Sequence, residues 1–380
     1  MKYGVLCAKQ TRNIGDDIQS YAQLRFLPTV DYMVEREQIS NFKSDNNEPV
    51  AVIMNAWWMW RKWNWPPAKS IIPLLTSIHM TEWTTENWGS SIKFEILEGL
   101  GRDYLNSYGP VGCRDKYTLD LMKKYKIKAY LSGCVTLTLP KMKKTKDNGK
   151  YICAVDVSEM VVEQLKNQIA HTNLELKIST HDLTEENESL TWEERMNNVE
   201  KVLTKYQNAK CVITSRLHVA LPCLAMEVPV LLVRNDPECN RFDPYIDLLH
   251  FMTEEQFLKG KYDIENPLKN REDYITYRKS LIKEIENFVE KTKKYDSNNS
   301  KDLIKVKYSD DEVKKWQYNL MSEALEKWFY RSREMLAEYN KTIDYLRKIE
   351  KENYELKNST SWKITKPIRL IKENIDKIVK

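Results

Sequence analysis

Residues 211–233 read CVITSRLHVALPCLAMEVPVLLV, and this stretch decides the fold class. It opens with the short β-branched run Cys211 to Thr214, which is typical of a buried strand. A helix-like segment reaches Met226, and Val228 to Val233 is typical of a second strand. The order strand, helix, strand predicts a parallel α/β sheet.

The first turn of this unit carries Ser215, Arg216 and His218. In open α/β sheets, ligands bind where the carboxyl ends of strands meet helix N-termini, and the free N–H groups and helix dipole there favour anions. One interpretation is therefore a phosphate or carboxylate site. The other is structural, with Arg216 in a surface ion pair and His218 as a hydrogen-bonded helix histidine. Taken alone, the pair favours the structural interpretation.

Composition describes an ordinary globular protein of two domains. The 380 residues exceed the ~250–300 at which a single core usually splits. The net charge of +5 is too mild to predict a nucleic-acid partner. Seven cysteines are scattered without a CxxC pair and there are five histidines, so we expect reduced thiols and no bound metal. Because no secretory signal opens the chain and no apolar run reaches ~20 residues, we expect a cytoplasmic protein without a membrane-spanning helix.

The N-terminal part repeats the strand-then-helix pattern. A strand over 2–7 leads through a turn at 11–17 to a helix over 18–27, which Asp16 or Asp17 can cap. In this turn Asn13 and Asp16 either hydrogen-bond sugar hydroxyls or shape the turn and cap the helix. Further predicted elements are strands at 50–54, 74–79 and 130–131, a helix over 117–125, and a linker at 141–150.

Five tryptophans lie in the short segment from Trp57 to Trp65. No helix or strand period places all five in one core, so we expect some of them to be exposed on a loop that Pro66-Pro67 ends. Exposed indoles such as Trp57 and Trp58 suit stacking on pyranose rings, and also membrane interfaces. The alternative is a partly buried aromatic cluster.

Cations gather at the predicted strand ends. Arg114 and Asp115 lie between a short strand and a helix, where they form either a structural pair or a second anion site. His181 follows a strand in the second α/β array, so neighbouring strands would bring it to the same rim as Arg216 and His218. Several positive groups at one rim are costly without an anion, which shifts the balance toward a binding site. The second array itself has strands at 151–155 and 175–178 and helices at 158–170 and 192–206.

The C-terminal part is long, charged helix. Leu336, Tyr339, Ile343 and Leu346 follow 3-4-3 spacing, which indicates a short coiled coil that would join copies of the chain. The tail SWKITKPIRLIKENIDKIVK has isoleucines at 4-3-4-3 spacing among lysines and arginines. It suits an anionic membrane surface, or packing against its own domain or a partner helix. The predicted domains are 1–145, 151–295, a helical extension at 300–358 and a basic amphipathic tail at 359–380.

Several ordered blocks resemble the polysaccharide pyruvyl transferase family. They are NIGDDIQ at 13–19, GCRD at 112–115 with Thr118, SGCVTLTL at 132–139, the stretch at 211–233, and Arg241-Phe242. The resemblance covers roughly residues 1–250. The segment TSWKITKPIR at 360–369 resembles the ends of bacterial glycan-assembly enzymes.

The resemblance implies an α/β protein with two Rossmann-like domains facing across a cleft, akin to GT-B glycosyltransferases. It implies phosphoenolpyruvate as donor, a co-substrate rather than a cofactor. The implied acceptor is a glycan or lipid-linked oligosaccharide of a cell-surface polysaccharide, onto which a cyclic pyruvate ketal is formed. Arginine binds phosphate and carboxylate in bidentate fashion, and histidine is the usual acid for protonating the donor's methylene carbon.

The resemblance also implies roles for individual residues. Arg216 is assigned to the donor's anionic groups, His218 to acid catalysis or phosphate binding, and His181 to the base. Further donor contacts are assigned to Arg114, Ser215 and Arg241, and acceptor contacts to Asn13, Asp16, Gln19, Trp57 and Trp58.

Two alternatives stay open. A protein with this scaffold and tail could be a glycosyltransferase that uses a nucleotide-sugar donor. It could also be a non-catalytic glycan-binding assembly protein, although the cation cluster argues against that. In each case we expect a cytoplasmic protein, held at the inner face of the membrane by its tail.

Overall fold

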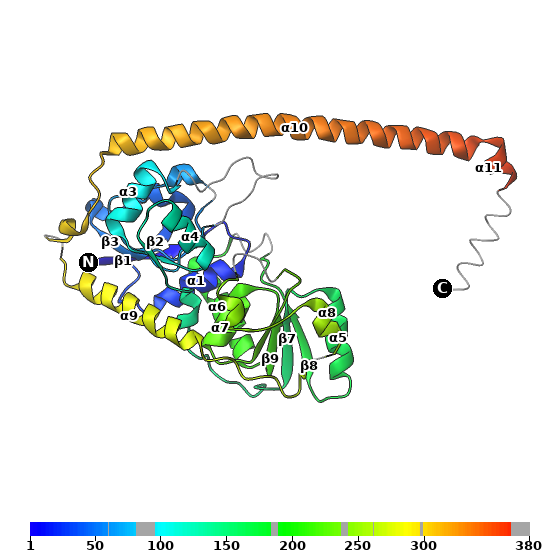
Figure 1. Cartoon of the computed structure of the whole chain (residues 1–380), viewed down its shortest axis with the longest axis horizontal. Helices are drawn as coiled ribbons and strands as arrows, with labels where there is room; N and C mark the ends of the chain where they lie inside the picture. Colours follow the sequence, from blue (N-terminus) through cyan, green and yellow to red (C-terminus); the bar gives the residue numbers. More distant parts are fainter. Residues whose placement is uncertain are drawn as a thin grey trace. The chain divides into compact units, whose positions relative to one another are not determined.

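The computed structural model describes residues 1–59, 61–80, 96–183, 189–236, 242–260, 262–296 and 299–365. Within this set, the residues up to Leu320 form one compact unit, and those from Met321 onward belong to a second unit. The first unit is a mixed α/β structure whose sheets are all parallel (Figure 1).

The N-terminal sheet has the strand order β2-β1-β3-β4. Its strands are β1 Lys2–Cys7, β2 Tyr32–Glu35, β3 Val50–Ile53 and β4 Ile71–Leu74. A short parallel pair, β5 Val111–Cys113 and β6 Ala129–Leu131, follows in the chain. It joins the first sheet irregularly, because Ile78 bridges to Cys113 just beyond the end of β4.

The second sheet has the strand order β11-β10-β9-β7-β8. Its strands are β7 Tyr151–Val155, β8 Glu175–Ser179, β9 Cys211–Thr214, β10 Val230–Val233 and β11 His250–Met252. Every residue of β9 and β10 is buried, which is why both strands are continuous apolar runs rather than alternating ones.

Helices follow the strands along the chain. They are α1 Ile14–Leu24, α3 Gly99–Tyr108, α4 Lys116–Lys124, α5 Glu159–Ile169, α6 Trp192–Gln207, α7 Leu217–Ala225, α8 Glu254–Leu258, α9 Tyr274–Lys293, α10 Asp310–Asn358 and α11 Thr360–Ile364. Short 3₁₀ helices are Arg36–Asn41, Asp45–Asn47, Lys62–Asn64, Val135–Thr138, Tyr245–Asp247 and Ser300–Leu303.

One apolar core joins the two halves of the first unit. Helix α7 is buried on all sides, as expected for a helix that is apolar all round. Ile14 and Ile18 of α1 belong to the same buried cluster as Val212 of β9 and Leu217 of α7. The prediction of two Rossmann-like α/β halves is confirmed, and the stretch at 211–233 lies at the centre of this shared core.

Two local predictions were wrong. The first helix begins at Ile14, not at 18, and its cap is Asn13, whose Oδ1 accepts from Gly15 N at 2.8 Å. Asp16 and Asp17 lie inside its first turn instead. The strand predicted at 74–79 ends at Leu74, because Ser77 has a φ of 54°, in the left-handed region that interrupts a strand.

Helix α9 returns the chain to the first sheet after the second sheet is complete. Tyr3 of β1 hydrogen-bonds Thr292 of α9 at 3.1 Å between their hydroxyl oxygens. The amino group of Met1 donates to the carbonyl of Tyr295, just after α9, at 3.0 Å. The predicted domain limits at 145 and 295 stay predictions.

Helix α10 is a single helix of 49 residues that begins in the first unit and continues into the second. In the described part of the chain, no helix has the length and apolar character needed to cross a membrane. Most of the predicted amphipathic tail, from residue 366 onward, lies outside the described residues.

Candidate active site

The carboxyl ends of the two sheets meet at the N-termini of α1 and α7. Asn13, after β1, forms a bridge with Asp182, after β8, and Ile14 N donates to the carbonyl of His181 at 3.0 Å. Gly15 allows the close approach, because a Cβ there would lie 3.0 Å from the His218 Cβ and Nδ1 atoms. The NIGD turn and the SRLH turn are therefore two walls of one site.

Arg114 lies at the centre of this junction and is fully buried. Its Nη1 donates to Gln19 Oε1 at 3.5 Å and to His218 Nε2 at 3.4 Å. Its Nε and Nη2 atoms have no hydrogen-bond partner among the described residues. A buried guanidinium with unmade hydrogen bonds is costly, so this geometry is suited to an anion that completes the set.

Asp115 contacts both Arg114 and His79. Its Oδ2 lies 3.8 Å from Arg114 Nε and 2.5 Å from His79 Nδ1, and all three side chains are buried. Burial opposes ionisation of this carboxyl, but the hydrogen bond and charge of His79, the charge of Arg114 and the bond from Thr118 N keep its pKa below the usual value. Asp115 therefore stays a carboxylate that compensates part of the charge around Arg114.

His218 is the second residue of α7 and is buried. An arginine is always a donor, so His218 Nε2 accepts the hydrogen bond from Arg114, and the proton of the neutral ring is on Nδ1. In this arrangement Nε2 carries no proton.

Arg216 is held by two carboxylates. Its Nε donates to Asp156 Oδ2 at 3.1 Å, and its Nη2 contacts both oxygens of Asp182 at 2.8 and 2.9 Å. Ser215 donates to the backbone carbonyl of Asp156. Asp156 has a φ of 50°, a costly conformation for a residue other than glycine, which aims its carboxylate at Arg216. An anion at Arg216 would have to compete with both acids.

His181 is buried at the end of β8. Its Nε2 is 2.8 Å from the hydroxyl of Tyr206, on which its ring is stacked. Burial, with a contribution from Arg216, lowers the pKa of His181 to about 4, while Asp156 acts in the opposite direction. The side chain is 1% exposed and neutral at pH 7. It is brought near Arg216 through Asp156 rather than by direct contact.

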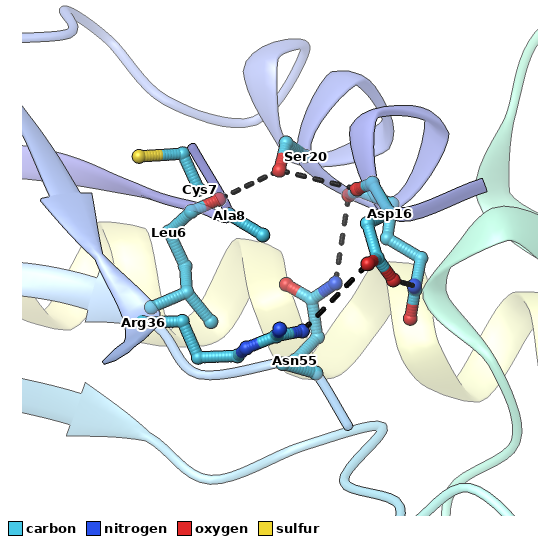
Figure 2. Close-up of a pocket in the computed structure, with 9 residues that line it drawn as sticks. Leu6, Cys7, Ala8, Asp16, Ser20, Arg36 and Asn55 are labelled. Atoms are coloured by element: carbon cyan, nitrogen blue, oxygen red, sulfur yellow. Dashed lines mark hydrogen bonds and ion pairs between the residues drawn. The ribbon is translucent and has the colours of Figure 1, made fainter. Parts of the chain in front are cut away.

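A small recess opens beside α1, at the carboxyl ends of β1 and β3 (Figure 2). It has room for about one water molecule, and its polar lining comes from Asp16, Gln19, Ser20, Arg36 and Asn55. Asp16 lies 3.8 Å from Arg36, and Asn55 Oδ1 is buried with no hydrogen-bond partner among the described residues. Since Gln19 contacts Arg114, the recess adjoins the Arg114 site. The amide oxygen there can accept a hydrogen bond from a water or from a hydroxyl of a bound ligand.

Trp57 and Trp58 differ in exposure, so the exposed-loop and aromatic-cluster interpretations do not apply equally to both. Trp58 is 2% exposed and packs edge-on against Trp65 at 5.3 Å, so it offers no face to a sugar ring. Trp57 is half-buried, and Arg36 lies over its ring at 5.3 Å. Aromatic clustering thus accounts for Trp58, while Trp57 lies beside the recess.

The sequence analysis did not predict four residues of this site, which are Asp156, Asp182, Arg36 and Asn55. Arg241 lies outside the described residues. The partners of Arg216, Asp156 and Asp182, both follow strands, and that position was a signal for them. Asn55 follows the strand predicted at 50–54, so the same signal was present for it, whereas Arg36 follows β2, which the sequence analysis did not predict.

Together these features define a class: an α/β protein with two Rossmann-like halves and a buried arginine–histidine pair where their strand ends meet. The sequence model of the polysaccharide pyruvyl transferase family matches residues 13–237, which is more than half of the chain. The chain belongs to this family. Its fold and its blocks therefore indicate an enzyme of polysaccharide modification.

Comparisons beyond the family give distant similarities. None of the curated proteins matches the chain significantly. Among solved structures, an uncharacterised protein of Klebsiella pneumoniae has 15% identity and a TM-score of 0.38, over 66% of this chain and 92% of that one. The UDP-GlcNAc 2-epimerase of Methanocaldococcus jannaschii has 12% identity and a TM-score of 0.37, over 74% and 99%. The wall teichoic acid polymerase TagF has 10% identity and a TM-score of 0.39, over 84% and 90%. Scores of this size carry no argument about function.

Proposed function

We propose that this protein transfers the pyruvyl group of phosphoenolpyruvate onto a sugar of a cell-surface polysaccharide or its lipid-linked precursor, forming a pyruvate ketal. The observation that carries the proposal is the buried Arg114, which contacts His218 and has two nitrogens without a hydrogen-bond partner in the described part of the chain. Membership of the family supplies the reaction class.

Arg114 is the better candidate than Arg216 for the main anion contact. Arg216 is already neutralised by Asp156 and Asp182. The carboxylate of Asp115, which contacts Arg114, is shared with His79. A phosphate or carboxylate of the donor would fill the open guanidinium positions in bidentate fashion. Arg216 and Ser215 then hold the α7 turn in place beside the donor.

His218 becomes an acid when the donor binds. An anion draws the N–H groups of Arg114 away from His218 Nε2, and its negative charge favours the imidazolium. His218 then gives its Nε2 proton to the methylene carbon, using the electron pair of the double bond and leaving the neighbouring carbon electrophilic. A sugar hydroxyl bonds to that carbon and returns a proton to His218. Phosphate leaves with the electrons of its carbon–oxygen bond and the proton of the second hydroxyl, which closes the ketal.

The acceptor would lie against the mouth of the recess on the N-terminal side, because the recess is too small to hold a sugar ring. Asp16 and Asn55 can accept hydrogen bonds from hydroxyls, and Arg36 can donate one. Trp57 beside the recess is placed for stacking on a sugar ring. Asn13 caps α1 and faces the junction, so we assign it to positioning the acceptor turn rather than to direct contact.

The donor half of the proposal can be tested without knowing the acceptor. Titration calorimetry of the full chain should show binding of phosphoenolpyruvate, and Arg114→Lys should weaken it at least tenfold, because a lysine makes no bidentate contact. The matched control is Arg278→Lys, whose arginine donates to the carbonyls of Leu137 and Ala225, away from the site. This variant should bind normally.

Three results would overturn the proposal. One is absence of phosphoenolpyruvate binding to the folded wild-type chain. Another is an equal loss of phosphoenolpyruvate binding in both variants, which would reflect a general effect on the fold. The third is binding of UDP-glucose in place of phosphoenolpyruvate, which would support a nucleotide-sugar glycosyltransferase.

A further inference from the structure

Helix α10 carries a continuous apolar seam. Its positions are spaced 4-3-4-3-4-3, and all but one are apolar: Leu325, Phe329, Ser332, Leu336, Tyr339, Ile343 and Leu346. This is the a/d pattern of a coiled coil, sustained over three heptads. At 1.5 Å per residue the seam is about 33 Å long.

The seam is exposed. Phe329, Leu336 and Tyr339 are 55%, 60% and 63% exposed, and Leu320 is the buried residue of the helix. Trp328 and Met335 form a second exposed apolar row on one flank. Helices in proteins owe most of their stability to packing of an apolar face, and a patch of large exposed side chains marks an interaction surface.

We propose that the seam binds the same seam of a second copy of this chain in antiparallel orientation. Reversing one copy about the midpoint between Leu336 and Tyr339 places each a residue opposite a d residue. The resulting layers pair Leu336 with Tyr339, Phe329 with Leu346, and the small Ser332 with the bulky Ile343. These three layers pair apolar side chains with apolar or small ones, whereas Leu325, at the end of the seam, lies opposite Glu350.

Flanking charges select this orientation. On the e flank, the reversal sets Glu326 of each copy opposite Arg347 of the other, and charges at flanking positions set the direction of pairing. In a parallel pair the same two residues would lie about 31 Å apart. On the other flank, Trp328 meets Ile349 and Met335 meets Thr342. Arg347 now contacts Asp344 of its own helix at 3.6 Å, an exposed pair that is readily exchanged.

Sedimentation of the full chain tests the pairing. We expect wild type to be a dimer and Leu336→Asp to weaken it at least a hundredfold, because a carboxylate would be buried in the central layer. Tyr345→Asp is the matched control, since Tyr345 is 62% exposed and lies off the seam. It should dimerise like wild type. A monomeric wild type, or an equal loss of dimerisation in both variants, would refute pairing through the seam.

A charge swap tests the orientation. Glu326→Arg and Arg347→Glu should each weaken the dimer roughly tenfold by opposing like charges. The double variant should recover to within about twofold of wild type, because the pair is restored with its signs exchanged. If the double variant loses as much dimer stability as the two single variants lose together, the helices do not pair in this antiparallel register.

Discussion

At the residue scale, the site is built from charges whose partners decide their roles. Arg216 and Arg114 are the same residue type at equivalent strand-end positions. Arg216 is ion-paired with two carboxylates, whereas two nitrogens of the buried Arg114 have no hydrogen-bond partner among the residues that the structure describes. From the sequence, Arg216 was expected to be the main anion contact and Arg114 a secondary one. The opposite order that we propose depends on Asp182 and His79, which are distant in the chain.

His181 illustrates a titratable residue whose main effect is on stability. Its folded-state pKa of about 4 lies below the usual 6.5 because the ring is buried. Above pH 6.5 the ring is neutral in both states. As the pH falls from 6.5 toward 4, only the unfolded chain takes up the proton, so stability is lost in that window.

We therefore expect His181→Gln to reduce the pH dependence of unfolding. Between pH 7.5 and 5 the wild type should lose about 2 kcal/mol more of its free energy of unfolding than the variant does. Urea denaturation at both pH values measures this. The control is His171→Gln, because His171 is exposed. Equal losses in wild type and His181→Gln would show that His181 is not the buried neutral group.

At the element scale, the N-terminus of α1 determines how closely the halves approach. Asn13 caps the helix, and Gly15 gives His218 room. The sequence predicted a helix here but started it four residues late, because Asp16 and Asp17 are also good caps. Which of three neighbouring capping residues is used depends on where the turn meets Asp182.

Removing this cap should have two effects. Asn13→Ala should cost about 1 kcal/mol of stability and should also lower phosphate release from phosphoenolpyruvate, because α1 backs His218. Ser158→Ala removes a comparable cap from α5, where Ser158 accepts from Val161 N. It should cost similar stability and leave turnover unchanged. Equal turnover in the two variants would show that the α1 cap does not contribute to catalysis.

At the scale of the whole first unit, a buried ion pair ties its halves together. Arg195 of α6 contacts both oxygens of Asp17 of α1, at 2.5 and 3.1 Å, and also donates to the carbonyls of Ala8 and Lys9. Burial raises the pKa of Asp17 to about 6, against the opposing effect of Arg195. The pair therefore depends on both members being present.

Breaking the pair on one side should be costly. Arg195→Met leaves the Asp17 carboxylate buried without its cation, for an expected loss of about 3–5 kcal/mol in chemical denaturation. Adding Asp17→Asn should recover part of this. Lys141→Met breaks an exposed pair with Glu227 at 2.6 Å and should cost no more than about 1 kcal/mol. A small loss in Arg195→Met would mean that the halves are held mainly by their apolar core.

Local pattern alone determined much of this protein. The buried runs at 151–155 and 211–214, the helix that follows Arg216, and the ordered family blocks all depend on neighbouring residues, so the α/β class and the family could be predicted from the sequence. Periodicity and turn chemistry act over a few residues, and these signals are complete in the chain itself.

Tertiary structure decided which side chains meet. Arg114 contacts His218 across 104 positions of the chain, and Arg195 contacts Asp17 across 178. Trp58 is buried although its segment resembles an exposed loop. The open donors of Arg114, the pairing of Arg216 and the depressed pKa of His181 all result from burial and long-range contact. These depend on how the two halves pack, which no local pattern encodes.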